Sequence, residues 1–393
     1  MQSNQLLTIL FLAVAFYDEV YYAVDSTVRP LLQQDLGLSY AQIGMLLGLP
    51  PILNAFLEPL LMLLGDTRWR RFLIIGGGLI LAVSAFAVGG TSGFLIVMAA
   101  EVIGFPASGA FATLSQATLM DTHHGREPQM MARWTVAGSI ASLVTPLLLA
   151  GAFLLAFRWR WAYVILGMVG AILSAIIFFH PFPVHTGHER GRRLVWEELQ
   201  CEAAEMLYGL RQALRNLLLL RWFILLQMAG LVLDFFVGYA ALYFTDVAML
   251  TASQTALVMS FLMAAGLLSD LILLPLLERF QGRVILRHSA ATTAVLYASF
   301  LLAPWAWLKV VLVVLMRFFT MGWYAVMQGE AYAAERGHSG TVKAIGSVFG
   351  LLGGMIAWLV GWVAEHFGLQ IGLWLLLFGP ICILFFVPRP ERE

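Results

Sequence analysis

Twelve long apolar segments decide what this chain can fold into. A helix that spans a bilayer needs about 20 predominantly apolar residues, and segments of this kind recur from end to end. Backbone groups facing lipid must be paired within their own segment, so each is predicted to be a helix. The composition agrees, because 61% of the 393 residues are hydrophobic and 12% are charged. The chain is therefore predicted to be an all-α polytopic membrane protein, with spans near 6–33, 41–64, 72–90, 94–120, 130–156, 161–180, 218–246, 253–277, 284–304, 308–334, 342–365 and 369–387.

Basic residues are distributed unevenly over the two sides of the predicted membrane. With the 65–71 connection in the cytoplasm, eighteen of the 23 Lys and Arg residues fall on that side. Only Arg158, Arg160 and Lys309 fall on the other side, and Arg29 and Arg317 lie within spans. Such a bias predicts that both termini are cytoplasmic, in the inner membrane of a bacterium. The net charge of zero argues against a nucleic-acid partner.

A polar stretch interrupts the series of spans once. Residues 181–217 contain a basic patch and then apolar residues at helical spacing, as in an amphipathic helix on a membrane surface. We therefore predict a six-helix N-terminal half over 1–180, a cytoplasmic linker over 181–217, and a six-helix C-terminal half over 218–393.

The two halves repeat the same pattern. Residues of similar type or position recur 212 to 216 places apart, which indicates an internal duplication. The matched pairs are Ser39 and Thr251, Glu58 and Asp270, and Asp66 and Glu278 at 212, with Asp18 and Asp234, and Glu101 and Arg317, at 216.

This organisation resembles the major facilitator superfamily over the whole chain. Asp66, Arg70 and Arg71 match part of the family's motif after the second span, and Phe157–Tyr163 resembles its Trp-Arg-Trp segment before the sixth. The start of the chain, with Asp18, is similar to drug and fosmidomycin-type exporters. The resemblance implies two parallel six-helix halves that line a cavity with their first and fourth spans.

Charged side chains on the first span form a narrow stripe. Asp18, Tyr22, Asp25 and Arg29 are spaced four, three and four residues apart, so they share one helix face. A charge at mid-bilayer costs at least roughly 2.5–3.5 kcal/mol, so this face must meet protein or a water-filled cavity. Asp18 and Glu19, together with Asp234 in span seven, are our candidate proton carriers. The alternative is that Asp18 or Glu19 pairs permanently with an arginine.

The same reasoning predicts a mixed polar cavity. We expect Asp25 and Arg29 to form a local ion pair. The alternative is that Arg29 forms part of an outer gate or binds an anion. Arg317 holds a carboxylate or phosphate, or neutralises Glu101. The predicted cavity residues are Tyr22, Asp25, Arg29, Glu101, Ser108, Arg317, Tyr324 and Gln328.

Charged residues at the cytoplasmic ends of the spans are expected to form a gate. Charge pairs there would hold the two halves together. For Glu58 and Asp270 two roles stay open, a structural ion pair with a cytoplasmic arginine or a part in coupling. The predicted gate residues are Glu58, Asp66, Arg70, Arg71, Asp270, Glu278, Arg279 and Arg283.

No catalytic pattern is present in the sequence. There is no phosphate-binding Gly-x-x-x-x-Gly-Lys loop, no zinc motif and no nucleophile elbow. We therefore expect no enzyme activity, no cofactor and no metal site.

The leading hypothesis is a monomeric secondary active transporter in the lipid bilayer, with a small-molecule substrate and protons as the coupling ion. We favour an antiporter for efflux of a small organic or amphipathic compound. Two alternatives are proton-linked uptake of a small solute or lipid-like substrate, and a non-transporting membrane sensor or assembly protein on the same scaffold.

Overall fold

The computed structural model describes residues 2–65, 69–123, 127–180, 216–334 and 339–388. All regular elements in these ranges are helical, so the predicted all-α class is confirmed. The predicted linker lies almost wholly outside the described residues, as does Asp66.

Eleven helical stretches of the described chain are long and apolar enough to cross a membrane. They coincide with eleven of the predicted spans. The remaining prediction, 342–365, falls within α14 (Ser339–Phe367), a helix of 29 residues. Some side chains of α14 lie outside the described part of the structure.

The chain divides into two compact units. Unit 1 comprises Met1–Leu38 and Pro50–Gln200, and unit 2 comprises Ser39–Leu49 and Cys201–Glu393. The boundary inside α2 (Tyr40–Gly65) therefore falls next to the Pro50–Pro51 pair. Proline has no N–H to donate, so the helical hydrogen-bond ladder is weakest here. Hydropathy alone places the whole of α2 in the first half.

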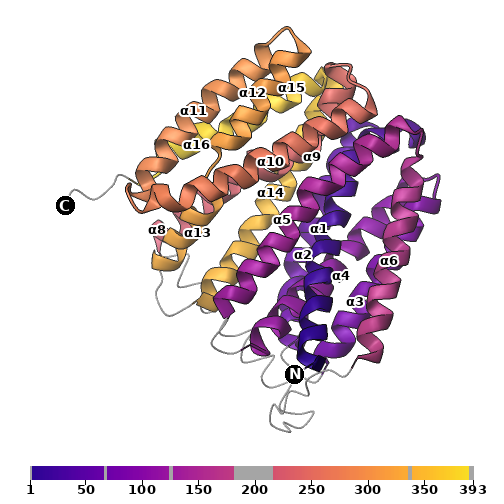
Figure 1. Cartoon of the computed structure of the whole chain (residues 1–393). Coiled ribbons are helices and arrows are strands. Elements are labelled where there is room, and N and C mark those ends of the chain that lie inside the picture. Colours follow the sequence, from indigo (N-terminus) through magenta and orange to yellow (C-terminus); the bar gives the residue numbers. More distant parts are fainter. Residues whose placement is uncertain (1, 66–68, 124–126, 181–215, 335–338, 389–393) are drawn as a thin grey trace. The chain divides into compact units, whose positions relative to one another are not determined.

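Unit 1 is built on close helix packing. Helix α3 packs against α4 and α6, and α1 packs against α4, α5 and α6 (Figure 1). At Gly77 of α3, an added Cβ would lie 2.7 Å from the carbonyl oxygen of Ala107 and 2.9 Å from the nitrogen of Phe111. The backbones of α3 and α4 are therefore in direct contact. Besides the second part of α2, the helices are α1 (Gln2–Leu36), α3 (Arg70–Gly90), α4 (Phe94–Asp121), α5 (Glu127–Leu154) and α6 (Trp159–Phe179).

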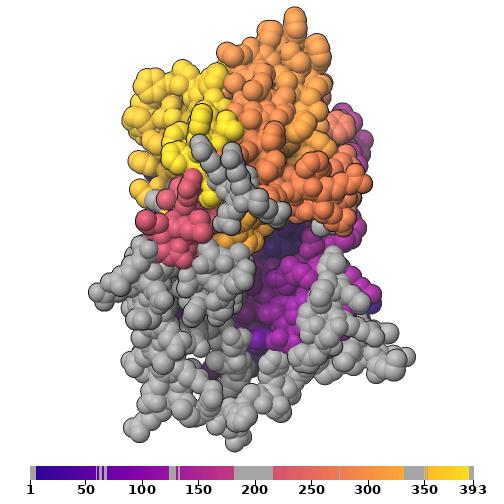
Figure 2. All heavy atoms as spheres, turned by 90° about the vertical axis from the view of Figure 1, so that its left-hand side faces the viewer, coloured from indigo at the N-terminus to yellow at the C-terminus, as the bar shows by residue number. Residues whose placement is uncertain are grey.

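Unit 2 contains the more irregular helices. In the space-filling view the orange atoms of α10 to α12 and the yellow atoms of α15 and α16 pack into one continuous surface (Figure 2). Its elements are α8 (Leu217–Gly230), η1 (Leu231–Phe235), α9 (Phe236–Leu242), η2 (Tyr243–Val247), α10 (Ala252–Leu277), α11 (Gly282–Leu302), α12 (Ala306–Phe319), α13 (Trp323–Ala334), α14, α15 (Leu369–Trp374), η3 (Leu375–Leu377) and α16 (Phe378–Phe386).

The seventh span is not the regular helix that hydropathy predicts. Two π-helical turns, η1 and η2, interrupt it, and they contain Asp234 and Asp246. Each π turn changes the helical phase, so residues before and after it do not share the face that a regular α-helix would give them. Asp234 is exposed, whereas Gly238 is buried. Such turns are rare and are frequent at functional sites.

The tenth span is broken, and the prediction of one helix over 308–334 is wrong. Helix α12 ends at Phe319 and α13 begins at Trp323. Between them Gly322 has a φ of 72°, a conformation that glycine adopts without strain. Arg317 therefore lies on a different helix from Tyr324 and Gln328, the other predicted cavity residues of this span.

Equivalent hydrogen bonds in the two units support the internal duplication. Arg160 donates to the carbonyl oxygen of Gly89 at 3.3 Å, and Gln370 donates to that of Leu301 at 2.8 Å. The donors are 370 − 160 = 210 residues apart and the acceptors 301 − 89 = 212. Both bonds satisfy carbonyl groups in the last turn of the third span of each half, α3 and α11, where no partner within the helix remains.

Lys309, which the sequence places outside the membrane, is a buried residue of α12. It is 7% exposed and donates hydrogen bonds to the Tyr243 hydroxyl and to the carbonyl oxygen of Phe300. Its ammonium group also lies over both of these aromatic rings. Lys309 thus joins α12 to the second π turn and to the last turn of α11.

Candidate functional site

Asp18 lies in the middle of α1 and faces α4. The Ser108 hydroxyl of α4 donates to Asp18 Oδ1 at 2.5 Å, and the Tyr22 hydroxyl donates to Ser108 Oγ at 3.2 Å. Among the described residues, no basic nitrogen lies within 4.0 Å of this carboxylate. A carboxylate without a cationic partner is expensive inside a membrane, and binding a proton removes that cost.

Glu19 faces a different neighbour. Its side chain is exposed and accepts a hydrogen bond from Ser142 of α5 at 2.8 Å. A Cβ at Gly138 of the same helix would lie 3.0 Å from Glu19 Cγ. Asp18 and Glu19 are therefore held by different helices and do not share one hydrogen-bond network.

The ion pair between Asp25 and Arg29 is present. The Tyr163 hydroxyl of α6 donates to Asp25 Oδ1 at 2.8 Å, and Glu101 of α4 adds a second carboxylate whose charge acts on Arg29. Arg29 Nη1 is buried and makes no hydrogen bond. This membrane-embedded arginine of unit 1 is thus held by one carboxylate directly and by another through space.

Arg317 is the membrane-embedded arginine of unit 2. Its Nη1 donates to Thr320 Oγ1 at 3.2 Å, whereas its Nε is buried without a hydrogen-bond partner. The charges of Asp234 and Asp270 act on the guanidinium. No carboxylate oxygen of the described chain lies within 4.0 Å of it. The two predicted roles of Arg317, binding a carboxylate or phosphate and neutralising Glu101, stay predictions.

The other predicted cavity residues of unit 2 lie beyond the helix break. Tyr324 is 64% exposed and Gln328 is half-buried, both in α13. Their neighbour Trp323 is fully buried instead, and its indole nitrogen donates to Ser289 of α11 at 2.8 Å. The cavity roles of Tyr324 and Gln328 stay predictions.

The gate residues of unit 1 brace helices of that unit. Arg70 pairs with Asp121 at the end of α4 at 2.5 Å and donates to the carbonyl oxygen of Gly65. Arg71 donates to the carbonyl oxygen of Phe178 at the end of α6 at 2.6 Å. These contacts tie the start of α3 to three neighbouring helices.

Unit 2 contains a matching brace. Arg283 makes two parallel hydrogen bonds with Glu330 of α13, at 2.8 and 2.7 Å, and lies over the Trp222 ring. The described pairs of Arg70 and Arg283 each join helices within one unit, and the predicted gate between the halves stays a prediction. Sequence reasoning named neither Asp121 nor Glu330 as a gate residue, because the pairing helices are far apart in the chain.

The remaining gate residues are less tightly held. Glu58 accepts a hydrogen bond from Asn54 at 3.1 Å, one turn earlier on α2. Asp270, Glu278 and Arg279 are exposed. None of these four makes an ion pair with another described residue.

We expect Arg283→Gln to lower the free energy of unfolding by about 1–2 kcal/mol. Removing one partner leaves the half-buried Glu330 carboxylate unpaired, a larger loss than at an exposed surface pair. Arg279→Gln is the control, because Arg279 is exposed nearby, and it should change stability by less than about 0.5 kcal/mol. Thermal unfolding of the purified proteins measures both. Equal losses of stability in the two variants would show that the pair of Arg283 with Glu330 does not stabilise unit 2.

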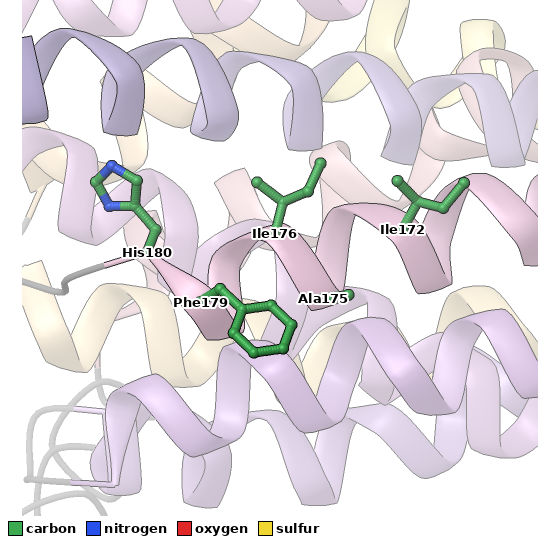
Figure 3. A pocket seen from close by; sticks show the side chains of 5 residues that line it. All are labelled: Ile172, Ala175, Ile176, Phe179 and His180. Atoms are coloured by element: carbon green, nitrogen blue, oxygen red, sulfur yellow. The ribbon is translucent and has the colours of Figure 1, made fainter.

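A shallow apolar pocket lies at the end of α6. Figure 3 shows the residues that line it, Ile172, Ala175, Ile176 and Phe179 of α6 and His180 directly after the helix. Its lining offers one polar side chain, so it lacks the groups that would orient a polar substrate. It lies apart from the charged residues of α1 and α4.

Comparisons with known proteins agree on the fold. The sequence matches the family model of the Major Facilitator Superfamily over residues 10–357. No curated protein matches the sequence.

Three solved structures illustrate the structural likeness. A bacterial homologue of the human lysosomal transporter Spinster, in an inward-facing conformation, has a TM-score of 0.78 at 14% identity, covering 98% of this chain and 96% of that chain. The nucleoside transporter NupG has a TM-score of 0.72 at 15% identity, covering 96% and 97%. A D-xylose–proton symporter has a TM-score of 0.67 at 15% identity, covering 98% of both.

Proposed function

The chain belongs to the major facilitator superfamily, and from this premise we propose that it couples the movement of a small organic compound to protons through Asp18. It is an integral membrane transporter, as its family and its apolar helices indicate. In the proposed cycle, the two halves alternate access to a site near the bilayer midplane. Protonation of Asp18 biases the balance between the two states.

One observation carries this proposal. Asp18 is a carboxylate in mid-span with only neutral hydrogen-bond partners among the described residues, Ser108 and through it Tyr22. Asp25, about two helical turns further along the same face, is instead neutralised by Arg29. A carboxylate that is already paired gains little from a proton, whereas an unpaired one in low dielectric gains much. Asp18 is therefore the preferred proton carrier, with Glu19 and Asp234 as secondary candidates.

Export by proton antiport is the favoured direction, with both termini in the cytoplasm of a bacterial cell and the monomer as the working unit. Proton-linked uptake is the second candidate. A D-xylose–proton symporter and a nucleoside transporter share this fold, and one fold supports either direction.

The test is a flux measurement in liposomes that carry an internal pH dye. Candidate drugs, sugars, organic acids, nucleosides and lysolipids are added outside in turn. An antiporter exchanges the entering compound for a proton and makes the lumen more alkaline, whereas a symporter makes it more acidic. The sign of the pH change therefore distinguishes the two directions, whichever way the protein is inserted.

Two outcomes would contradict the proposal. Labelled compound that moves without any pH change would show that protons are not the coupling ion. A panel in which neither compound nor protons move would favour the non-transporting alternative.

A further inference from the structure

We infer that unit 2 contains a subsite for a zwitterionic group of the substrate, formed by Arg317, Asp234 and Asp270. The guanidinium would bind a carboxylate or phosphate, and the two aspartates would bind the neighbouring ammonium. This inference rests on the proposed function only in treating the bound molecule as a transported substrate.

The first argument is that Arg317 is not paired. Four described arginines each hold a carboxylate directly, namely Arg29, Arg70, Arg160 and Arg283. Arg317 lies against Gly266 of α10, and Asp270 is one turn further along the same helix. The charges of Asp270 and Asp234 act on the guanidinium, yet neither carboxylate lies within 4.0 Å of it. The separation leaves both the guanidinium and the carboxylates available to a polar group between them.

The second argument is that the guanidinium is held in place. A Cβ at Gly266 of α10 would lie 3.1 Å from Arg317 Nε and 3.2 Å from Nη2, so the group lies against the helix at the one residue without a side chain. Nη1 donates a hydrogen bond to Thr320 Oγ1 at 3.2 Å. The buried Nε still has a proton to donate and no partner, which leaves part of the guanidinium's donor set for an oxyanion.

The third argument comes from the backbone. The π turn η1 contains Asp234, and the break between α12 and α13 begins three residues after Arg317. Discontinuous helices of transporters are typical of substrate and ion sites. Both irregularities occur in unit 2 and involve side chains whose charges act on each other.

Charge selects the class of molecule. A simple anion would meet Arg317 but also the exposed carboxylates of Asp234 and Asp270. A simple cation would meet these carboxylates but also the guanidinium. A zwitterion pairs with both signs at once, so it avoids the repulsion that either single charge would meet.

The test is a binding measurement on the full-length protein in lipid nanodiscs by calorimetry. The probes are glycine betaine and glycerophosphocholine as carboxylate and phosphate zwitterions, choline as the cation, and acetate and dimethyl phosphate as the anions. We expect at least one zwitterion to bind at least tenfold more tightly than any singly charged probe. Which zwitterion binds better distinguishes a carboxylate from a phosphate substrate.

Variants locate the binding. Arg317→Gln should weaken zwitterion binding at least tenfold, and Arg279→Gln, which changes an exposed arginine, should leave it unchanged. Gly266→Ala retains every charge, but its new methyl group would shift the Arg317 guanidinium, so it should also weaken zwitterion binding. This second variant tests the subsite if Arg317→Gln fails to fold. No preference for zwitterions, including no binding of any probe, would overturn the inference, as would unchanged binding in a folded Arg317→Gln or in Gly266→Ala. In Asp18→Asn the affinity can change through coupling, but the preference for a zwitterion over the singly charged probes should remain, so failure of proton coupling and failure of this subsite are distinguishable.

Discussion

The Asp18→Asn variant should exchange substrate across the membrane and lose its response to a proton gradient. Asparagine resembles a protonated aspartate in size and can still accept the hydrogen bond from Ser108, but it cannot gain or lose a proton. Coupling between two ligands typically amounts to about 1–3 kcal/mol, or about 5–150-fold. Gradient-driven accumulation should fall by a factor in this range.

Liposome assays separate the two activities. Accumulation of labelled substrate under an imposed pH gradient measures coupling, and substrate exchange without a gradient measures the carrier cycle alone. Asp35→Asn is the matched control, because Asp35 is paired with Arg160 at the end of α1 and is far along the helix from Asp18. If Asp18→Asn still accumulated substrate against its gradient, and Glu19→Gln did not, the proton carrier would be Glu19.

The Gly77→Val variant should destabilise the protein by about 3 kcal/mol, at the upper end of typical overpacking costs. The new side chain would meet the backbone of α4 at Ala107 and Phe111, and backbone atoms of a packed helix cannot rotate away as a side chain can. The helices α3 and α4 would have to separate. The measurement is the midpoint of thermal unfolding of the purified protein.

Gly76 supplies the control for this prediction. It precedes Gly77 in the same helix, and a Cβ at Gly76 would have no neighbour within 4 Å. Gly76→Val should therefore change the free energy of unfolding by less than about 0.5 kcal/mol. Similar losses in both variants would show that contact with α4 does not set the cost, since valine has a higher helix propensity than glycine.

Features that depend on the local sequence were predictable. Hydropathy located the spans, because apolar length alone decides whether a helix crosses lipid. Helical periodicity placed Asp18, Tyr22, Asp25 and Arg29 on one face of α1, and Ser108 and Glu101 of α4 do act on residues of this face. Residues four apart on one helix also predicted the ion pair of Asp25 with Arg29.

Features that depend on distant segments were not predictable. Ser142, Tyr163 and Glu330 are polar partners supplied by other helices, and nothing in their local sequence distinguishes them from packing residues. The π turns leave no hydropathy signal, since they change the helical phase without changing composition.

The break in the tenth span left one signal in the sequence. Gly322 lies at 322 − 216 = 106 in the first half, where the repeat has Pro106 inside α4. Both residues weaken a helix, glycine by its backbone freedom and proline by its missing N–H. The duplication therefore places a helix-weakening residue at this position in both halves, but α4 continues through Pro106 as one helix, so the repeat alone does not predict the break.

Helix α2 belongs partly to unit 1 and partly to unit 2, and this division affects the order in which the protein can be assembled. Ser39–Leu49 belongs to unit 2, where Tyr40 N donates to Glu365 at 2.7 Å and a Cβ at Gly48 would clash with the carbonyl oxygen of Gly354. The ribosome makes this segment with the first half and α14 much later, so unit 2 stays incomplete until nearly the whole chain has been synthesised. A C-terminal half expressed alone would lack one of its own packing surfaces, and only co-expression with the N-terminal half would restore it.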